Sequence, residues 1–160
     1  MKLIKSSSGH MAKVSDEDYE NLSAYKWNTL KKKSRIEGRY FTTTVGYKNI
    51  YMHRMIMGAP NGQEIDHING DPSDNRRENL RVATRSQNCA NRRDYKSKSG
   101  FRGVHSSRNK SNAWSARITL NGVAKTGGTF RTAEEAARRY DEMAQEAFGA
   151  FAILNFPAEK

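Results

Sequence analysis

The stretch that begins at Asp66 and His67 constrains the fold most, because turn signals and short apolar runs alternate there within a few residues. Residues 69–72, Asn-Gly-Asp-Pro, are typical of a tight turn after a strand. Residues 79–82 are strand-like, and a threonine cap opens a predicted helix over residues 84–92. The pattern predicts a strand, a turn-rich loop, a second strand and a helix, which brings the two ends of the stretch together.

Four side chains of this stretch suit the hydrolysis of a phosphodiester. Asp66 and Asn88 offer oxygen ligands of the kind that a hard cation such as Mg²⁺ prefers. A neutral His67 beside the metal can take a proton from water, while the cation stabilises charge on the phosphate and on the departing 3′ oxygen. Asn79 is placed to orient the His67 ring. The same residue types also serve as turns and caps, so a non-catalytic version of the fold is the alternative.

Residues 66–70, 75–81 and 86–88 together resemble the HNH homing endonucleases of phages and bacteria, whose ββα-metal fold uses one Mg²⁺ or Mn²⁺ to nick or cut DNA. The resemblance implies Asp66 and Asn88 as the metal ligands. It also implies His67 as the general base and Asn79 as the partner that orients it. In that family a His-Arg pair commonly precedes the Asp-His pair, so we expect His53 to support the site or to take part in it directly.

The charge of the chain points to a polyanionic partner. Its 160 residues carry a formal net charge of +11. Residues 76–110 hold eleven Lys and Arg against two acids, which is typical of a surface that neutralises phosphates. From this segment we expect DNA contacts by Arg76, Arg77, Arg81, Arg85, Arg92, Arg93, Lys96 and Lys98. Residues 94–100 have the composition of a basic linker lying along the DNA backbone, with a solvated loop as the alternative.

Other features of the sequence concern its compartment and its N-terminal part. The single cysteine, Cys89, excludes a disulfide framework, and neither a membrane-spanning apolar run nor a signal peptide is evident, so we expect a cytoplasmic protein. Residues 39–45 and 49–52 predict a β-hairpin. We expect the nearby aromatic residues Trp27, Tyr40, Tyr47 and Tyr51 to pack in a small core rather than to stack on bases.

The pattern changes completely in the C-terminal part of the chain. Residues 101–107, 113–120 and 123–130 predict three strands, and Asn121-Gly122 is a strong hairpin turn. A capping box at residues 132–135 opens an amphipathic helix that ends at glycine 149. We therefore expect one helix packed on one face of a three-stranded antiparallel sheet, with the other face open.

Residues 101–104, 128–130, 132–141 and 154–157 resemble the Apetala-type DNA-binding domain of plant ethylene-response factors. That family lays its sheet in the major groove, so the resemblance implies DNA contacts from Arg102, Arg108, Trp114, Arg117 and Lys125. Trp114 could equally belong to the packed face of the sheet. His105 stands where the plant proteins usually carry Arg, so the docking mode is carried over and the target sequence is not.

Together these features predict an α+β chain of two modules. Residues 1–93 form a ββα-metal nuclease domain with its core at about 62–92, residues 94–100 the linker, and residues 101–157 the DNA-binding domain. The expected function is a site-directed, homing-type endonuclease of bacterial or phage-infected cells, acting on double-stranded DNA with one Mg²⁺ or Mn²⁺ and leaving a 5′-phosphate and a 3′-hydroxyl. One site per chain favours a monomer, with a dimer as the alternative. The other functions considered are a regulator with a relic nuclease domain, and a phage HNH enzyme of packaging or restriction.

Overall fold

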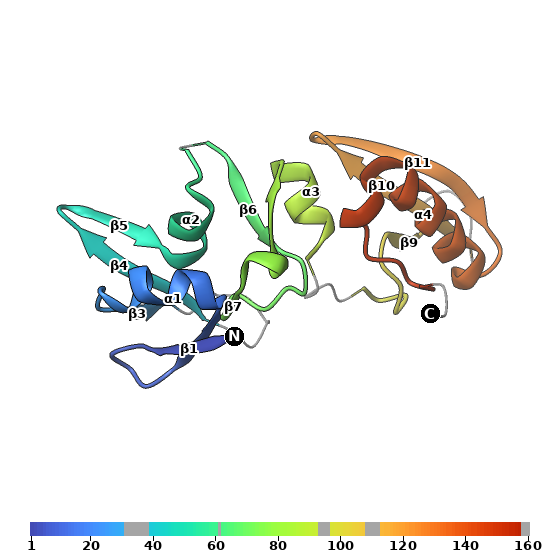
Figure 1. The fold of residues 1–160 in the computed structure, drawn as a ribbon. Helices are drawn as coiled ribbons and strands as arrows, with labels where there is room; N and C mark the ends of the chain where they lie inside the picture. The colour runs from blue at the N-terminus through green and yellow to red at the C-terminus, as the bar shows by residue number, and fades with distance from the viewer. Residues whose placement is uncertain (31–38, 61, 93–96, 108–112, 158–160) are drawn as a thin grey trace. The chain divides into compact units, whose positions relative to one another are not determined.

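The computed structural model describes residues 1–30, 39–60, 62–92, 97–107 and 113–157 of the chain (Figure 1). Its contacts divide it into two compact units, Met1–Thr84 and Arg85–Lys160. Arg93, Lys96 and Arg108, expected at DNA, lie outside the described residues, as does much of the predicted linker. None of the described helices is long and apolar enough to cross a membrane.

The first unit consists of small sheets around one apolar core. In chain order its elements are β1 (Lys2–Lys5), β2 (Met11–Val14), α1 (Asp16–Ser23), β3 (Asn28–Leu30), β4 (Tyr40–Val45), β5 (Lys48–Tyr51), α2 (Met52–Met57), β6 (Glu64–His67), β7 (Asp74–Asn75), η1 (Arg77–Asn79) and β8 (Leu80–Ala83). The sheets are ordered β1-β2-β7, β3-β4-β5 and β6-β8. The core is built on Trp27, Phe41 and Met52, all almost completely buried. The predicted hairpin of residues 39–52 thus forms as β4 and β5.

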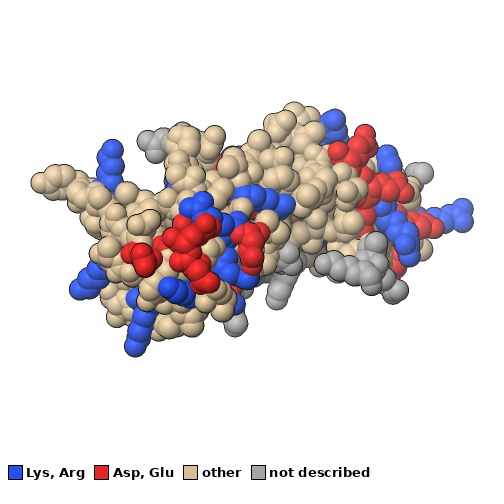
Figure 2. Space-filling view, in the orientation of Figure 1, with Lys and Arg blue, Asp and Glu red and all other residues tan. Residues whose placement is uncertain are grey.

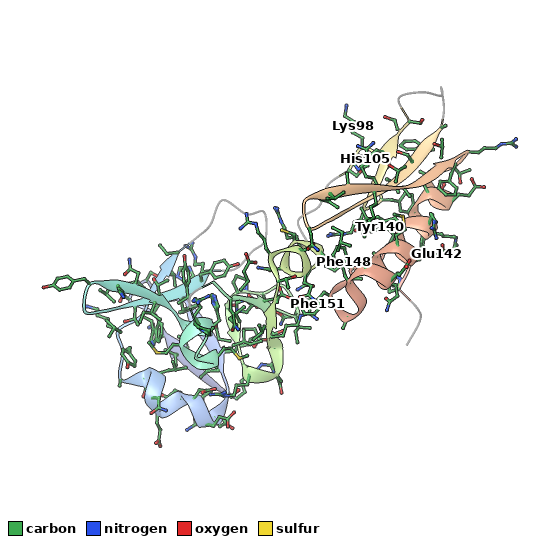
Figure 3. The ribbon with its side chains drawn as sticks, turned by 90° about the horizontal axis from the view of Figure 1, so that it is seen from above. Lys98, His105, Tyr140, Glu142, Phe148 and Phe151 are labelled. Carbon is green, nitrogen blue, oxygen red and sulfur yellow. The ribbon has the colours of Figure 1, made fainter. Side chains whose placement is uncertain are left out.

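The second unit packs one helix on a three-stranded antiparallel sheet (Figure 1). Its elements are α3 (Arg85–Ala90), β9 (Val104–Ser106), β10 (Trp114–Leu120), β11 (Val123–Phe130), α4 (Ala133–Phe148) and η2 (Gly149–Phe151). Asn121 and Gly122 both take positive φ, as an Asn-Gly hairpin turn requires. Helix α4 begins with the predicted capping box of Thr132 and Glu135. Figure 3 shows Tyr140 and Phe148 on the helix side of the sheet, where both side chains are buried.

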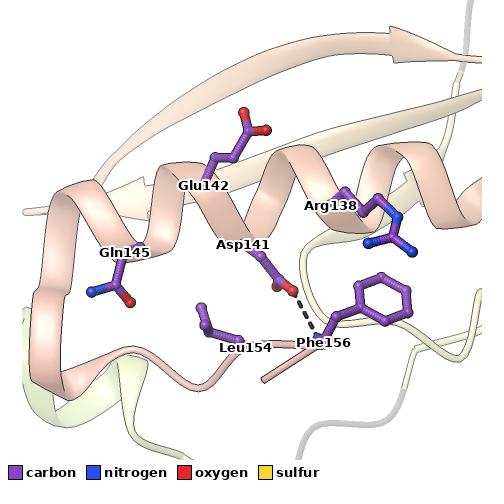
Figure 4. A pocket seen from close by; sticks show the side chains of 6 residues that line it. All are labelled: Arg138, Asp141, Glu142, Gln145, Leu154 and Phe156. Carbon is purple, nitrogen blue, oxygen red and sulfur yellow. Dashed lines mark hydrogen bonds between the residues drawn. The ribbon is translucent and has the colours of Figure 1, made fainter. Parts of the chain in front are cut away.

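The C-terminal segment is held against α4 by one carboxylate. Asp141 accepts hydrogen bonds from the backbone N–H groups of Asn155 (2.8 Å) and Phe156 (2.8 Å) and from the Asn155 amide (2.9 Å). Figure 4 shows this contact beside Arg138, whose guanidinium lies 4.6 Å from the centre of the Phe156 ring. Asn155 in turn accepts the backbone N–H of Arg102 (2.7 Å). The end of the chain therefore braces the start of the sheet.

Helix α3 belongs by its contacts to the second unit. Ala90 is part of an apolar cluster with Ala116, Tyr140 and Phe148. The hydroxyl of Ser86 accepts the backbone N–H of Asn121 at the hairpin turn (3.3 Å). The contacts of the chain thus divide at Thr84, ahead of the helix that the sequence analysis placed in the nuclease domain.

Gly103 is a position at which any side chain should destabilise the second unit. Its φ is +69°, and an added Cβ would overlap the ring of Tyr140. We expect Gly103→Ala to lower the free energy of unfolding of this unit by about 2–4 kcal/mol, measured by thermal and urea denaturation. Gly100 is the matched control, because its φ is +80° but no atom lies within 4 Å of an added Cβ. Equal effects of Gly100→Ala and Gly103→Ala would show that the Tyr140 contact does not matter.

Candidate active site

His67 is the buried centre of the candidate site. It is the last residue of β6, whose antiparallel pairing with β8 sets His67 opposite Leu80 and Asp66 opposite Arg81. The His67 side chain is only 6% exposed, and its Nε2 lies 3.4 Å from Oδ1 of the fully buried Asn75. The amide of Asn75 donates to the carbonyl of Pro72 (3.3 Å), which turns its oxygen toward the imidazole.

This contact suits one tautomer of the ring. An amide oxygen only accepts hydrogen bonds, so Oδ1 of Asn75 matches a His67 ring with its hydrogen on Nε2 and its basic lone pair on Nδ1. Burial is the largest effect on the imidazole and lowers its pKa below 6.5, while the Asn75 contact and the carboxylates of Asp66, Asp71 and Asp74 act in the opposite direction. His67 is therefore neutral at pH 7, as a general base must be.

Three aromatic side chains form a wall beside His67. The ring of His53, from α2, lies 5.1 Å from that of His67 in an edge-to-face arrangement. The ring centres of Tyr40 and His67 are 6.1 Å apart, and those of Tyr51 and His53 are 5.4 Å apart. Burial raises the pKa of Tyr40, so its hydroxyl stays protonated at neutral pH. The structure thus brings the predicted His53 to His67 and adds two tyrosines that we had assigned to the core.

Asp66, one of the two predicted metal ligands, precedes His67 in the sequence and is also buried. Its carboxylate is 5% exposed and accepts a hydrogen bond from Nε of Arg81 (2.9 Å). The ion pair compensates the buried charge, and it assigns Arg81, expected at DNA, to the site itself. A carboxylate and a carboxamide are hard oxygen donors that suit Mg²⁺, which keeps several waters and needs few protein ligands. The described residues hold no cluster of three or more His, Cys, Asp or Glu side chains that could hold a metal ion.

Asn79 holds the loop that follows His67. Its Oδ1 accepts the backbone N–H of Asn69 (3.0 Å), and its amide donates to the Asn69 side chain (3.0 Å) and to the carbonyl of Asp74 (2.7 Å). We expected Asn79 to orient the His67 ring, whereas the carboxamide that contacts the ring in the structure belongs to Asn75. The Asp-Asn pair at residues 74–75 was the available signal, but only the folded loop shows which of two nearby asparagines reaches the imidazole.

Two further arginines expected at DNA are engaged by carboxylates of the first unit. Arg76 makes a bidentate pair with Asp74 (2.8 Å for both bonds) and contacts Glu78. Arg77 makes a bidentate pair with Asp18 (2.9 and 2.7 Å), a residue of α1. Figure 2 shows this mixture of acidic and basic side chains on the visible face. These arginines therefore join loop and helix within the unit.

In the second unit, Asn88 lies on α3, and the end of that helix is held by Arg102. The Arg102 guanidinium donates to the carbonyl of Ala90 (3.3 Å) and to that of Arg92. The resemblance implies a DNA contact by Arg102. In the structure its guanidinium contacts carbonyls at and just after the C-terminal end of α3, where a cation is stabilising.

The side of the sheet opposite α4 keeps a polar hollow. His105, Ser115, Arg117, Thr126 and Thr129 line about 470 Å³ there. Arg117 and Lys125 are exposed. Trp114 packs instead against the apolar cluster of Val104, Ala136 and Ala137 on the helix side. Figure 3 shows Lys98 and His105 together near β9, and both line a second hollow of about 400 Å³.

Comparison with known proteins identifies a family. The model of the HNH endonuclease family matches residues 50–90, which hold His53, Asp66, His67, Asn75 and Asn79 and extend through α3. An HNH endonuclease of Acanthamoeba polyphaga mimivirus is 30% identical over 159 residues, covering 96% of this chain and 79% of the viral protein. The similarity therefore includes both units, and the chain belongs to the HNH endonuclease family.

Proposed function

We propose that this chain is a site-directed DNA endonuclease of the homing type, which hydrolyses a phosphodiester with one divalent cation and His67 as general base. The observation that carries the proposal is the environment of His67. The ring is buried and neutral, Asn75 faces its Nε2, and the carboxylate of Asp66 precedes it in the same strand.

In the proposed reaction, Nδ1 of His67 takes a proton from water, whose oxygen attacks the phosphorus as the bond to the 3′ oxygen breaks. The products are a 5′-phosphate and a 3′-hydroxyl, which receives its proton from solvent. Asp66 would hold the cation together with Asn88, and the role of Asn88 rests on the sequence pattern. When bound, Mg²⁺ or Mn²⁺ supplies charge stabilisation at the phosphate and the departing oxygen. Arg81 keeps the Asp66 carboxylate in place, and His53 and Tyr40 exclude water from one side of the imidazole.

We also propose that the partner is double-stranded DNA, bound in part by the open face of the sheet in the second unit. Arg117 and Lys98 support this, because each lines a hollow on or next to the sheet, and Lys125 is exposed on β11. Arg85 and Arg92 would add phosphate contacts, and the net charge of +11 favours binding to a polyanion. Arg76, Arg77 and Arg81 stand in ion pairs and contribute less. A cell infected by a virus is the proposed setting, since the relative is viral.

The proposal is tested by cleavage of source-genome DNA with Mg²⁺, Mn²⁺ or EDTA, with ends mapped by sequencing. We expect metal-dependent cuts at one or a few sites. His67→Ala should slow cleavage by about 10²- to 10⁴-fold and leave DNA affinity unchanged, because the base acts in the transition state. His10→Ala is the control, since His10 is exposed and far along the chain. Normal turnover by His67→Ala would remove His67 from the mechanism, and tight binding without any cleavage would favour a regulator.

The cleavage rate should fall only in moderately acidic solution. Burial lowers the pKa of His67 below the ordinary 6.5, so the neutral base persists at pH 6.5 and is lost as the pH falls further. A cation bound nearby acts in the same direction, because it also disfavours the imidazolium. Single-turnover rates measured across acidic and neutral pH should give a midpoint below 6.5. A midpoint above that value would contradict a buried, neutral imidazole.

Substitutions of Arg102 and Arg117 should have different effects, because we expect Arg102 to stabilise α3 and Arg117 to contact DNA. Arg102→Met removes the donors to the carbonyls of Ala90 and Arg92, so it should destabilise the second unit by about 1–2 kcal/mol and slow cleavage, with little change in DNA affinity. Arg117→Met should weaken DNA binding and reduce the slope of log K against log salt concentration by about one. The free energy of unfolding should not change. The measurements are urea denaturation and salt-dependent binding to a duplex. The reverse pattern would show that Arg102 contacts DNA in the plant manner.

A further inference from the structure

The β4–β5 hairpin extends beyond the body of the first unit. Burial along β4 ends at Thr43, and residues 44–49 are all exposed. Figure 1 shows the two strands reaching away from α1 and α2 to a free tip. A two-stranded ribbon with both faces in water gains little stability from its own side chains. The distal half of the hairpin is therefore not explained by the packing of the unit.

An aromatic ring stands at the tip of this hairpin. Val45 pairs with Lys48, which leaves Gly46 and Tyr47 as a two-residue turn. Gly46 has a φ of +61°, whereas Asn121 is the only described residue other than glycine with a positive φ, so the turn is of type II′. A type II′ turn requires glycine at its first central position. Its geometry does not require an aromatic residue at the second central position, where Tyr47 lies. Tyr47 is fully exposed (105%), so the sequence-based expectation that it packs in the core is wrong.

The other end of the same hairpin is the wall of the candidate active site. Tyr40 begins β4 and lies against His67, and Tyr51 ends β5 and lies against His53. Tyr51 lies four positions after Tyr47, about 14 Å at the rise of a β-strand, and Tyr40 lies seven positions before Tyr47, about 24 Å. On duplex DNA these lengths correspond to about four to seven base-pair steps. A phosphate at His67 would therefore place the tip a short way along the same duplex.

We propose that Tyr47 is a DNA-contacting residue whose ring inserts against a base step about four to seven base pairs from the scissile phosphate. This inference rests on the proposed function, since it takes the substrate of the His67 site as its partner. Residues 39–52 contain no Asp or Glu, and Lys48 lies beside Tyr47 to contact a phosphate. The ribbon has the width that the major groove of DNA admits. A protein partner would need a larger apolar patch than Val45 and Tyr47 offer.

The test measures binding of the full chain to a short mixed-sequence duplex in EDTA, beside cleavage of source-genome DNA with Mg²⁺. Tyr47→Ala should weaken binding by about five- to 100-fold, the range for loss of aromatic stacking on a base. Tyr47→Phe should bind as the wild type does, because the ring is kept. Met11→Ala is the matched control, an exposed apolar side chain of the first unit outside the hairpin. All three variants should keep the wild-type melting temperature, since neither side chain is buried.

A duplex carrying 2-aminopurine should report the unstacked step by brighter fluorescence with the wild type and with Tyr47→Phe, and not with Tyr47→Ala. Equal affinity of Tyr47→Ala and the wild type would overturn the inference and leave the nuclease proposal standing. Equal weakening by Tyr47→Phe would assign the effect to the hydroxyl and overturn ring insertion. Tyr47-dependent binding without any cleavage would keep the DNA contact and refute the nuclease proposal. A wild type that binds no duplex would refute both.

Discussion

The candidate site depends on the pairing of β6 with β8. This short antiparallel pair sets Asp66 opposite Arg81 and His67 opposite Leu80, and so gives the buried carboxylate its cation and the imidazole its place. Burial of two ionisable groups side by side is costly unless each finds a partner. The ion pair with Arg81 offsets this cost for Asp66. His67 avoids it by remaining neutral beside Asn75. Burial of these groups lowers the stability of the fold, but it also lowers the pKa of His67 and keeps the proposed base neutral.

The loop between these strands shows how charge in this chain is divided between structure and substrate. Asn79 holds the turn through Asn69, and Asp74 is held by Arg76, so hydrogen bonds tie together the loop that carries Asn75 to the ring. A chain with 36% hydrophobic residues has few apolar side chains with which to stabilise such a loop. Several basic residues in the first unit therefore stabilise it, and the excess positive charge available to DNA must come from other positions.

The second unit combines a sheet with an open polar face and a helix that carries Asn88. Arg102, Ala90 and Ser86 all tie α3 to the elements of that unit. The residues matched by the HNH endonuclease family nevertheless run from 50 to 90 and so cross the division of the contacts at Thr84. The family's sequence unit and the compact units of this structure are thus different divisions of the same chain.

The sequence by itself determined the elements and the family. Asn121-Gly122 and the box at Thr132 depend on local backbone chemistry, and the short spacing from Asp66 to Asn79 is a local pattern as well. Only the tertiary structure decided which neighbour each polar side chain meets. Asn75 rather than Asn79 reaches His67, Arg102 binds the end of α3, and Tyr47 is exposed while Tyr40 reaches the site. Such contacts join residues that are distant in sequence, or distinguish neighbours by a few ångströms of loop geometry, and no local propensity records either.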